Sequence, residues 1–408
     1  MVDRYLWALP CLLLAACASA GSDSSGTAGT SGAGGTTGSA GTSGAGAGFG
    51  MGGPFNFPQA KKSGACTITT VGSPQNAVTS AYNAWKGTYV VPGDVGMRVQ
   101  SPEPIPANGG ITNSTVSEGI GYGMLAAAYM ADRNTFDGLW NYAKAHFDAV
   151  GLMNWHITSA GAIASGGTGS ASDGDEDMAW ALLMASDQWS STQYLSDAQA
   201  LINNILYNSV ANDGMLKPGD AWGSSATTYP DYFSPAYYRA FARATDNQAW
   251  VSQVIERGYT ILGNMEGTDG LVPDSTTDSA TSPSGTYGYD ACRTPWRIAM
   301  DYCFNGEPRA QTYLAKIGAF FNGIGANSIG DGYNSATNAV TSSNHNMAFI
   351  GPAGVAGMAG YQTLLDGAFN FGSTNSATGG NNAYFPQSLR VITMLMMSGN
   401  FLDYSQLQ

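Results

Sequence analysis

Hydrophobic residues recur at helical spacing from about residue 78 to residue 402 of this 408-residue chain, and the periodic stretches come in pairs. Each pair is an apolar stretch, a short polar turn and a second amphipathic stretch. Successive pairs begin about 55–60 residues apart, a period typical of stacked supersecondary units. The predicted pairs are 121–130 with 135–147, 177–186 with 194–206, 235–244 with 248–262, 294–304 with 309–321, 348–360 with 361–369, and 384–397 with a helix near 78–85.

Six helical hairpins predict an all-α domain in which the pairs close into a ring. An open α-solenoid would share the period, but solenoids usually lack long aromatic-rich loops that all fall between units. Here the connecting segments 151–172, 207–233 and 264–289 are long and rich in Gly, Ser, Asp and Trp. Loops carried on a rigid scaffold are where function concentrates. Strand-like alternation is sparse.

The N-terminal residues lack this periodicity. Arg4 precedes a short apolar run that ends in Leu-Ala-Ala-Cys, which resembles a bacterial lipoprotein signal and implies lipidation of Cys17. An ordinary secretory signal, cut shortly after Cys17, is the alternative; both predict export, either anchored at the cell envelope or secreted. We therefore expect three parts: a signal segment (1–17), a flexible Gly/Ser/Thr/Ala-rich linker (18–54) and a folded helical domain (55–408).

The amino-acid composition argues against several classes of function. The net charge is −13 and no basic face is evident, which argues against binding nucleic acid. Three His and the lack of a paired-Cys motif argue against a zinc site, and we expect no metal or cofactor. The 9 Trp and 21 Tyr suit neutral ligands with apolar faces, such as sugars, although most such rings are expected in the core. We expect a monomer whose only link to a membrane is the lipid anchor.

Export permits disulfides in the domain. Cys292 and Cys303 are expected on one helix, about 16 Å apart along its axis, which is too far for a bond between them. At most one of them could pair with Cys66, and a free buried thiol is equally compatible with the sequence.

Acidic residues stand at the starts of three predicted helices. The first is Glu118, in Ser-Glu-Gly-Ile-Gly-Tyr-Gly-Met at 117–124. Glycine costs a helix about 1 kcal/mol relative to alanine, so three at alternate positions suggest close approach of the backbone to a ligand or a neighbouring helix. The alternative is a simple N-terminus, in which Ser117 caps the helix and Glu118 favours its dipole.

The second group crowds four acids into the five positions 173–177. It resembles the first half of an EF-hand loop, but methionines stand where that loop needs Gly and Glu, so a calcium site is not expected. Capping explains one or two acids but not four that repel one another. At least one should point into a cleft and pair with a ligand hydroxyl or with a base such as Arg293.

The third group contains Asp290 and Arg293, three positions apart and hence on one face. An arginine there can hold the carboxylate ionised and fixed, as a general base requires. A surface ion pair of little energetic value is the alternative. The apolar neighbours Ala291 and Trp296 argue against a simple solvated face.

At these residues the chain resembles glycoside hydrolase family 8. The matching pieces occur in the order of the family and span about residues 60–402. The resemblance implies an (α/α)6 barrel and inverting hydrolysis of β-1,4-linked polysaccharides. The pieces are Ser-Glu-Gly-x-Gly-Tyr-Gly-Met at 117–124, Ala-Ser-Asp-Gly-Asp-x-Asp at 171–177, Ala-Trp-Gly at 221–223, Tyr-Phe-Ser-Pro at 232–235 and Tyr-Asp-Ala-x-Arg at 289–293.

The resemblance also implies roles. Glu118 would be the general acid, Asp290 the general base, and Asp173 the residue that holds the distorted sugar at the cleavage point. Because Asp290 is present, the chain resembles the cellulase and xylanase branch of the family more than the chitosanase branch. The sugar groove would be lined by Trp222, Tyr232 and Tyr289, with Arg293 as the partner of the base, and by Trp155 and Tyr384 from their approximate spacing.

These observations favour a surface-tethered endo-β-1,4-glucanase acting on cellulose-type chains. Xylan or mixed-linkage glucan is the alternative substrate on the same scaffold. A non-catalytic polysaccharide-binding lipoprotein is the alternative of another class, but binding alone would not need both Glu118 and Asp290. Acid catalysis near neutral pH requires a protonated carboxyl, so a raised pKa is expected for Glu118 from burial or from nearby Asp173.

Overall fold

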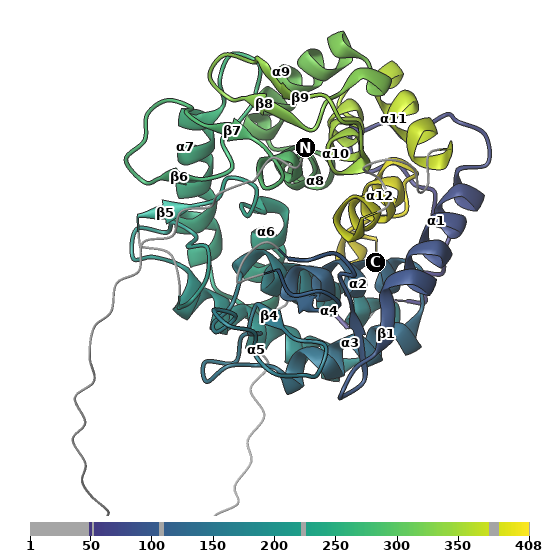
Figure 1. Cartoon of the computed structure of the whole chain (residues 1–408), viewed down its shortest axis with the longest axis vertical. Helices are drawn as coiled ribbons and strands as arrows, with labels where there is room; N and C mark the ends of the chain where they lie inside the picture. The colour runs from purple at the N-terminus through teal and green to yellow at the C-terminus, as the bar shows by residue number, and fades with distance from the viewer. Residues whose placement is uncertain (1–48, 51–52, 106–109, 222–225, 375–382, 408) are drawn as a thin grey trace, which may run out of the picture. The chain divides into compact units, whose positions relative to one another are not determined.

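Six inner and six outer α-helices form the framework of the described part of the computed structural model (Figure 1). All described residues belong to one compact unit, Ala47–Gln408. Two residues singled out from the sequence, Cys17 and Trp222, lie outside the described residues. The described residues are 49–50, 53–105, 110–221, 226–374 and 383–407.

The inner helices follow one another around a closed ring. Each contacts the next, and the last, α12, contacts α2. Figure 1 shows these six helices around the centre of the barrel. The inner helices are α2 (Ser117–Tyr129), α4 (Ser172–Gln188), α6 (Pro235–Thr245), α8 (Thr294–Asn305), α10 (Met347–Gly357) and α12 (Tyr384–Met397).

Each inner helix is paired with an outer one, as the hairpin period predicts. The outer helix follows its inner partner in the chain, except that the N-terminal α1 packs on the C-terminal α12. The predicted all-α (α/α)6 barrel is confirmed. The outer helices are α3 (Arg133–Ala145), α5 (Thr192–Ser209), α7 (Glu256–Met265, after the π-helical turn η1, Trp250–Ile255), α9 (Pro308–Ile324), α11 (Gln362–Thr374) and α1 (Pro74–Tyr89).

Burial explains why the inner helices and the outer helices differ in sequence. Every residue of α4 and of α10 is buried, and α12 is buried except at Phe385. A helix that is covered on all sides can be apolar all round, whereas the outer helices keep one polar face for solvent. The four acids at 173–177 are an exception to this rule: α4 begins at Ser172, five residues earlier than expected, so all four lie within the helix and are buried.

Glycines allow α2 and α4 to cross at short range. A Cβ on Gly121 would lie 2.7 Å from Cβ of Asp177, and a Cβ on Gly174 would lie 2.7 Å from the backbone of Ser117. Carbon atoms pack at about 3.5–4.0 Å, so neither position accepts a side chain without displacing a helix. The expectation that the glycines after Glu118 permit close approach to a neighbouring helix is confirmed.

Short antiparallel strands lie in the connections between helices. The pair β3–β4 joins Val116 to His156, and β3 ends directly before α2, which carries Glu118. The strand pairs are β1 (Val90–Pro92) with β2 (Met97–Val99), β3 (Thr115–Val116) with β4 (His156–Ile157), and β5 (Thr227–Thr228) with β6 (Thr276–Thr277), and a three-stranded sheet contains β7 (Thr286–Tyr287), β8 (Gly332–Asn334) and β9 (Val340–Ser342).

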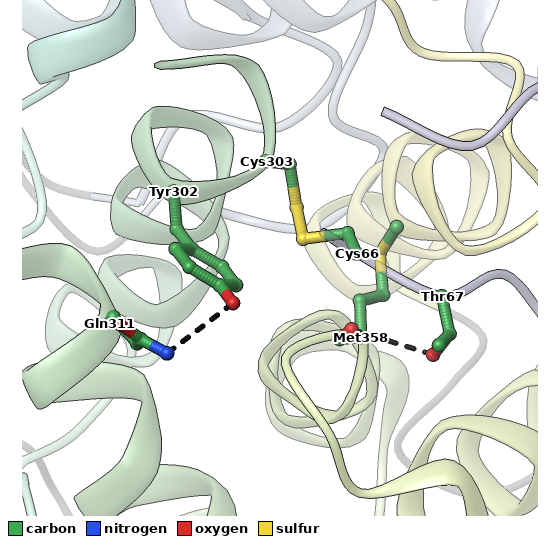
Figure 2. Close-up of a disulfide and its surroundings, with 6 residues drawn as sticks. All are labelled: Cys66, Thr67, Tyr302, Cys303, Gln311 and Met358. Atoms are coloured by element: carbon green, nitrogen blue, oxygen red, sulfur yellow. Dashed lines mark hydrogen bonds between the residues drawn. A yellow bond between two sulfur atoms is a disulfide. The ribbon is translucent and has the colours of Figure 1, made fainter. Parts of the chain in front are cut away.

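The segment before α1 runs across the C-terminal ends of the inner helices. The backbone N–H of Gly50 donates to Asp187 at the end of α4, and that of Thr69 donates to the carbonyl of Met397 at the end of α12. Cys66 forms a disulfide with Cys303 at the end of α8 (Figure 2). The contact with Met397 satisfies a backbone carbonyl that a helix end leaves open.

The disulfide decides between the alternatives for the cysteines. Cys303 pairs with Cys66, their Cα atoms 5.3 Å apart, and Cys292 is a free buried thiol.

None of the helices in the described residues is both long and apolar enough to cross a membrane.

Candidate active site

A cleft of about 380 Å³ opens where the inner helices begin. Its walls come from the N-terminal ends of α2, α4 and α12, from the residues before α8, and from the loops around Ser101 and Trp155. Residues that are distant in the sequence therefore meet at one end of the barrel. The predicted site residues that line the cleft are Glu118, Trp155, Asp173, Tyr232, Asp290, Arg293 and Tyr384.

Arg293 lies at the centre of the charged groups. Its side chain is 1% exposed, and its Nη1 donates to Glu118 Oε2 and to Asp173 Oδ2, both at 2.7 Å. Its Nη2 donates to Asp290 Oδ1 at 3.2 Å and lies 2.7 Å from Asp231 Oδ2. One guanidinium thus contacts four carboxyl groups, including the acidic partner that was expected from 173–177.

Asp231 was missed by sequence reasoning. Its side chain is fully buried, and Arg293 is the cation beside it. The only local signal is a single acid directly before Tyr232 in the aromatic-rich segment 231–235. Burial of a carboxylate is costly unless it is paired, so an acid surrounded by aromatic residues is a reason to look for a distant base.

The environment of Glu118 favours its protonated form. Burial raises the pKa of the Glu118 carboxyl to about 7, and it outweighs the opposing effects of Arg293 and of the hydroxyl of Tyr384, which donates to Oε1 at 3.0 Å. The nearby charge of Asp173 adds to the increase. The predicted rise in pKa is confirmed, and such a group keeps a substantial protonated fraction near neutral pH, as a general acid requires.

Asp290 lies just before the 3₁₀ turn η2 (Ala291–Arg293) that leads into α8. Burial raises the pKa of its carboxyl to about 7; Arg293 lowers it, and Asp274 raises it. The expected ionising influence of Arg293 is present, but burial is the larger effect. A base with a pKa near the working pH combines proton affinity with a substantial ionised fraction.

Asp274 holds the loop that carries Asp290. Its Oδ1 accepts the backbone N–H groups of Gly288 at 2.8 Å and of Ala291 at 2.9 Å, on either side of Asp290. A Cβ on Gly288 would collide with the Asp274 carboxylate, which explains the glycine there. Asp274 is fourteen residues before Gly288, and no local pattern indicates the contact.

Aromatic rings flank the charged groups. The Tyr232 ring is 6% exposed, stacks on Tyr229 with centroids 5.1 Å apart, and lies 5.5 Å from the guanidinium carbon of Arg293. The indole Nε1 of Trp155, which also lines the cleft, donates to the carbonyl of Gly166 at 2.9 Å, and this hydrogen bond orients its ring.

Tyr289 does not line the cleft, in contrast to its neighbour Asp290. Its hydroxyl donates to Asp331 Oδ2 at 2.5 Å and accepts from Asn346 Nδ2 at 3.0 Å. Tyr289 is nevertheless 46% exposed.

The remaining acids of 173–177 have structural partners. Asp175 accepts the backbone N–H of Met153 at 3.1 Å, and Glu176 accepts the hydroxyl of Tyr238 at 2.8 Å. The carboxylate of Asp177 is paired with the buried Arg297, whose Nη2 donates to it at 2.9 Å. Only Asp173 of the four lines the cleft. In the part of the chain that the structure describes, no group of three or more His, Cys, Asp or Glu side chains is arranged to hold a metal ion.

Comparison with known proteins agrees with this geometry. Residues 55–399 match the model of the glycosyl hydrolases family 8. The chain belongs to glycoside hydrolase family 8. Members of family 8 are inverting glycosidases, and inversion needs a gap between acid and base that admits a water molecule, roughly 6.5–9.5 Å. The chain is a glycoside hydrolase, and its Glu118 and Asp290 bind different nitrogens of one guanidinium.

Several family 8 proteins are similar over most of their length. The chain is 38% identical to Endoglucanase A of Acetivibrio thermocellus, across 82% of this chain and 72% of that protein. It is 35% identical to Endoglucanase 2 of Ruminiclostridium josui, across 85% of this chain and 76% of that protein. Its structure superposes on a β-1,3-1,4-glucanase from Paenibacillus sp. X4 with a TM-score of 0.76 and 30% identity, covering 86% of this chain and 99% of the other.

Proposed function

We propose that this chain is an endo-acting β-1,4-glucanase of the cellulase type, with Glu118 as general acid and Asp290 as general base. The observation that carries the proposal is the cleft in which these two carboxyl groups, both with a pKa of about 7, bind one buried guanidinium. The relatives named endoglucanases, at 35–38% identity, support the substrate class and the endo action.

The reaction proceeds in one displacement. Protonated Glu118 gives its proton to the glycosidic oxygen, and the bond from that oxygen to C1 breaks. Ionised Asp290 takes a proton from a water molecule, whose oxygen attacks C1 from the opposite face and inverts it. Asp173, fixed by Arg293, binds the distorted sugar between them. Proton exchange with solvent then restores both carboxyl groups.

Mixed-linkage β-glucan is a second candidate substrate. Its support is the structural likeness to the β-1,3-1,4-glucanase, which reaches 30% identity. Such chains contain β-1,4 bonds, so the same acid and base would cleave them. Likeness to xylose-releasing enzymes at 20–21% identity concerns the fold alone.

The proposal includes export and lipidation of Cys17. Its support is the Leu-Ala-Ala-Cys sequence at 14–17 and the Cys66–Cys303 disulfide, a bond typical of oxidising compartments. Labelling with radioactive palmitate should mark the wild-type protein and not Cys17→Ser. Absence of label in the wild type would contradict the anchor and leave the secreted form.

Substrate and mechanism are tested by hydrolysis. Release of reducing ends from carboxymethylcellulose and lichenan should exceed release from xylan and chitosan. Glu118→Gln and Asp290→Asn should each lose about 10³-fold in kcat, because each removes one proton-transfer group. Proton NMR should show the α-anomer as the first product from a β-glucan. Full activity in either variant contradicts the assigned acid and base, and a β-anomer contradicts inversion.

A further inference from the structure

We propose that Glu103 is a substrate-binding residue that selects for neutral sugar chains. In this inference, which rests on the proposed glucanase function, the Glu103 carboxylate accepts hydrogen bonds from the hydroxyls of a sugar unit bound beside Glu118. The same carboxylate disfavours chains that carry acidic substituents at that position.

Glu103 lines the same cleft as the proposed acid and base. It belongs to the loop at 101–105, which is outside all the motifs of the sequence, and its side chain is half-buried. Its Oε2 accepts the backbone N–H of Tyr384 at 3.3 Å and the hydroxyl of Ser101 at 3.4 Å. The Ser101 hydroxyl also lies 3.1 Å from the backbone carbonyl of Glu103, so the N–H of Tyr384 is the main contact that orients the carboxylate. Its Oε1 has no hydrogen-bond partner among the described residues.

Tyr384 connects Glu103 with the reaction centre. Its backbone N–H binds Glu103, and its hydroxyl binds Glu118. Both carboxylates thus lie along one tyrosine on one wall of the cleft. A sugar unit that lies against this wall would meet Glu103 while its neighbour in the polymer meets Glu118. Hydrogen bonds to a charged acceptor are the stronger kind, so they contribute to binding.

The charge of Glu103 is not compensated within the cleft. Arg293 is the cation among the described lining residues, and its nitrogens are occupied by Glu118, Asp173, Asp231 and Asp290. A carboxylate without a nearby cation attracts hydroxyl donors and repels another carboxylate. Placing like charges opposite one another is a common way to exclude the wrong ligand.

A purely structural role is the competing explanation, since Glu103 could simply support Tyr384. Glu103→Gln separates the two, because the amide oxygen can still accept the N–H of Tyr384 while the negative charge is lost. Glu103→Ala removes both the hydrogen-bond acceptor and the negative charge. Glu256→Gln serves as the matched control, because Glu256 is an exposed residue at the start of the outer helix α7, outside the cleft.

The experiment compares two cellulose derivatives with the same backbone. Hydroxyethylcellulose carries neutral substituents and carboxymethylcellulose carries acidic ones. We measure kcat and KM on both at low and at high salt. Glu103→Gln should lose about tenfold in kcat/KM on hydroxyethylcellulose, mainly through KM, because a charged hydrogen bond is lost. On carboxymethylcellulose at low salt the loss should be smaller, since repulsion is relieved, and the ratio of the two activities should shift at least about threefold.

The outcomes are distinct. An equal loss on both substrates at low salt, or wild-type behaviour of Glu103→Gln with loss only in Glu103→Ala, would show that Glu103 merely supports Tyr384 and would overturn the proposal. Glu118→Gln should lose activity on both substrates. If Glu118→Gln keeps full activity, the catalytic assignment fails, whatever the ratio for Glu103→Gln shows.

Discussion

The hydroxyl of Tyr384 donates a hydrogen bond to Oε1 of Glu118, across 266 positions of the sequence, at 3.0 Å. Gly119 makes the approach possible, because a Cβ there would lie 2.8 Å from that hydroxyl. The hydrogen bond stabilises the ionised carboxyl and lowers the pKa of Glu118 against the larger effect of burial. Tyr384 therefore limits how high that pKa rises.

Tyr384→Phe should raise the pKa of Glu118, because the hydrogen bond to the ionised form is lost. The alkaline limb of the kcat/KM profile, where the acid loses its proton, should move to higher pH, and kcat should fall about tenfold. Tyr302→Phe is the control and should keep the wild-type profile, because it removes a hydroxyl at the C-terminal end of α8, which Gln311 of α9 contacts. An unchanged alkaline limb in Tyr384→Phe would contradict the assignment of Glu118.

Asp274→Asn should lower the pKa of Asp290, because the charge of Asp274 raises it. The amide oxygen can still accept the N–H groups of Gly288 and Ala291, so the loop should keep its position. We expect the acidic limb of the pH profile, where the base becomes protonated, to move to lower pH. Asp278→Asn is the control in the same connection. A shift of the alkaline limb instead would indicate that the roles of Asp290 and Glu118 are reversed.

Gly121→Ala should destabilise the barrel by about 1–3 kcal/mol, because a Cβ there meets Asp177 at 2.7 Å and overpacks the crossing of α2 and α4. Gly87→Ala is the matched control on the outer helix α1, where a Cβ meets nothing within 4 Å. It should stabilise the protein by up to about 1 kcal/mol through helix propensity. Denaturant unfolding measures both changes, and equal effects would contradict the packing argument.

His156 should make the protein less stable as the pH falls. Its side chain is fully buried, both ring nitrogens have no hydrogen-bond partner in the described part of the chain, and burial lowers its pKa. The unfolded chain therefore binds a proton more readily than the folded one below about pH 6.5, and stability contributed by the neutral ring is lost there. Urea unfolding of His156→Phe at pH 5 and pH 7 should show a smaller pH dependence than the wild type; parallel curves would exclude this role.

The hairpins could be predicted from sequence because helix periodicity is local, and the long loops between them favoured a ring over an open solenoid. The hairpin pattern also placed Glu118, Asp173 and Asp290 at the starts of helices, whereas their roles came from the resemblance to family 8. Asp231 and Asp274 were missed because their partners are distant in the chain and their own surroundings carry no pattern. The position of Tyr289 outside the cleft depends on its long-range contacts with Asp331 and Asn346, which sequence spacing does not record.

The contacts of Arg293 have a consequence for the energy of a whole turnover. In the proposed reaction Glu118 gives up one proton while Asp290 gains one, and both carboxyl groups bind the same guanidinium. One negative charge disappears at Nη2 as another appears at Nη1, so the total charge around the arginine stays constant. Arg293 therefore faces the same total carboxylate charge before and after the two proton transfers.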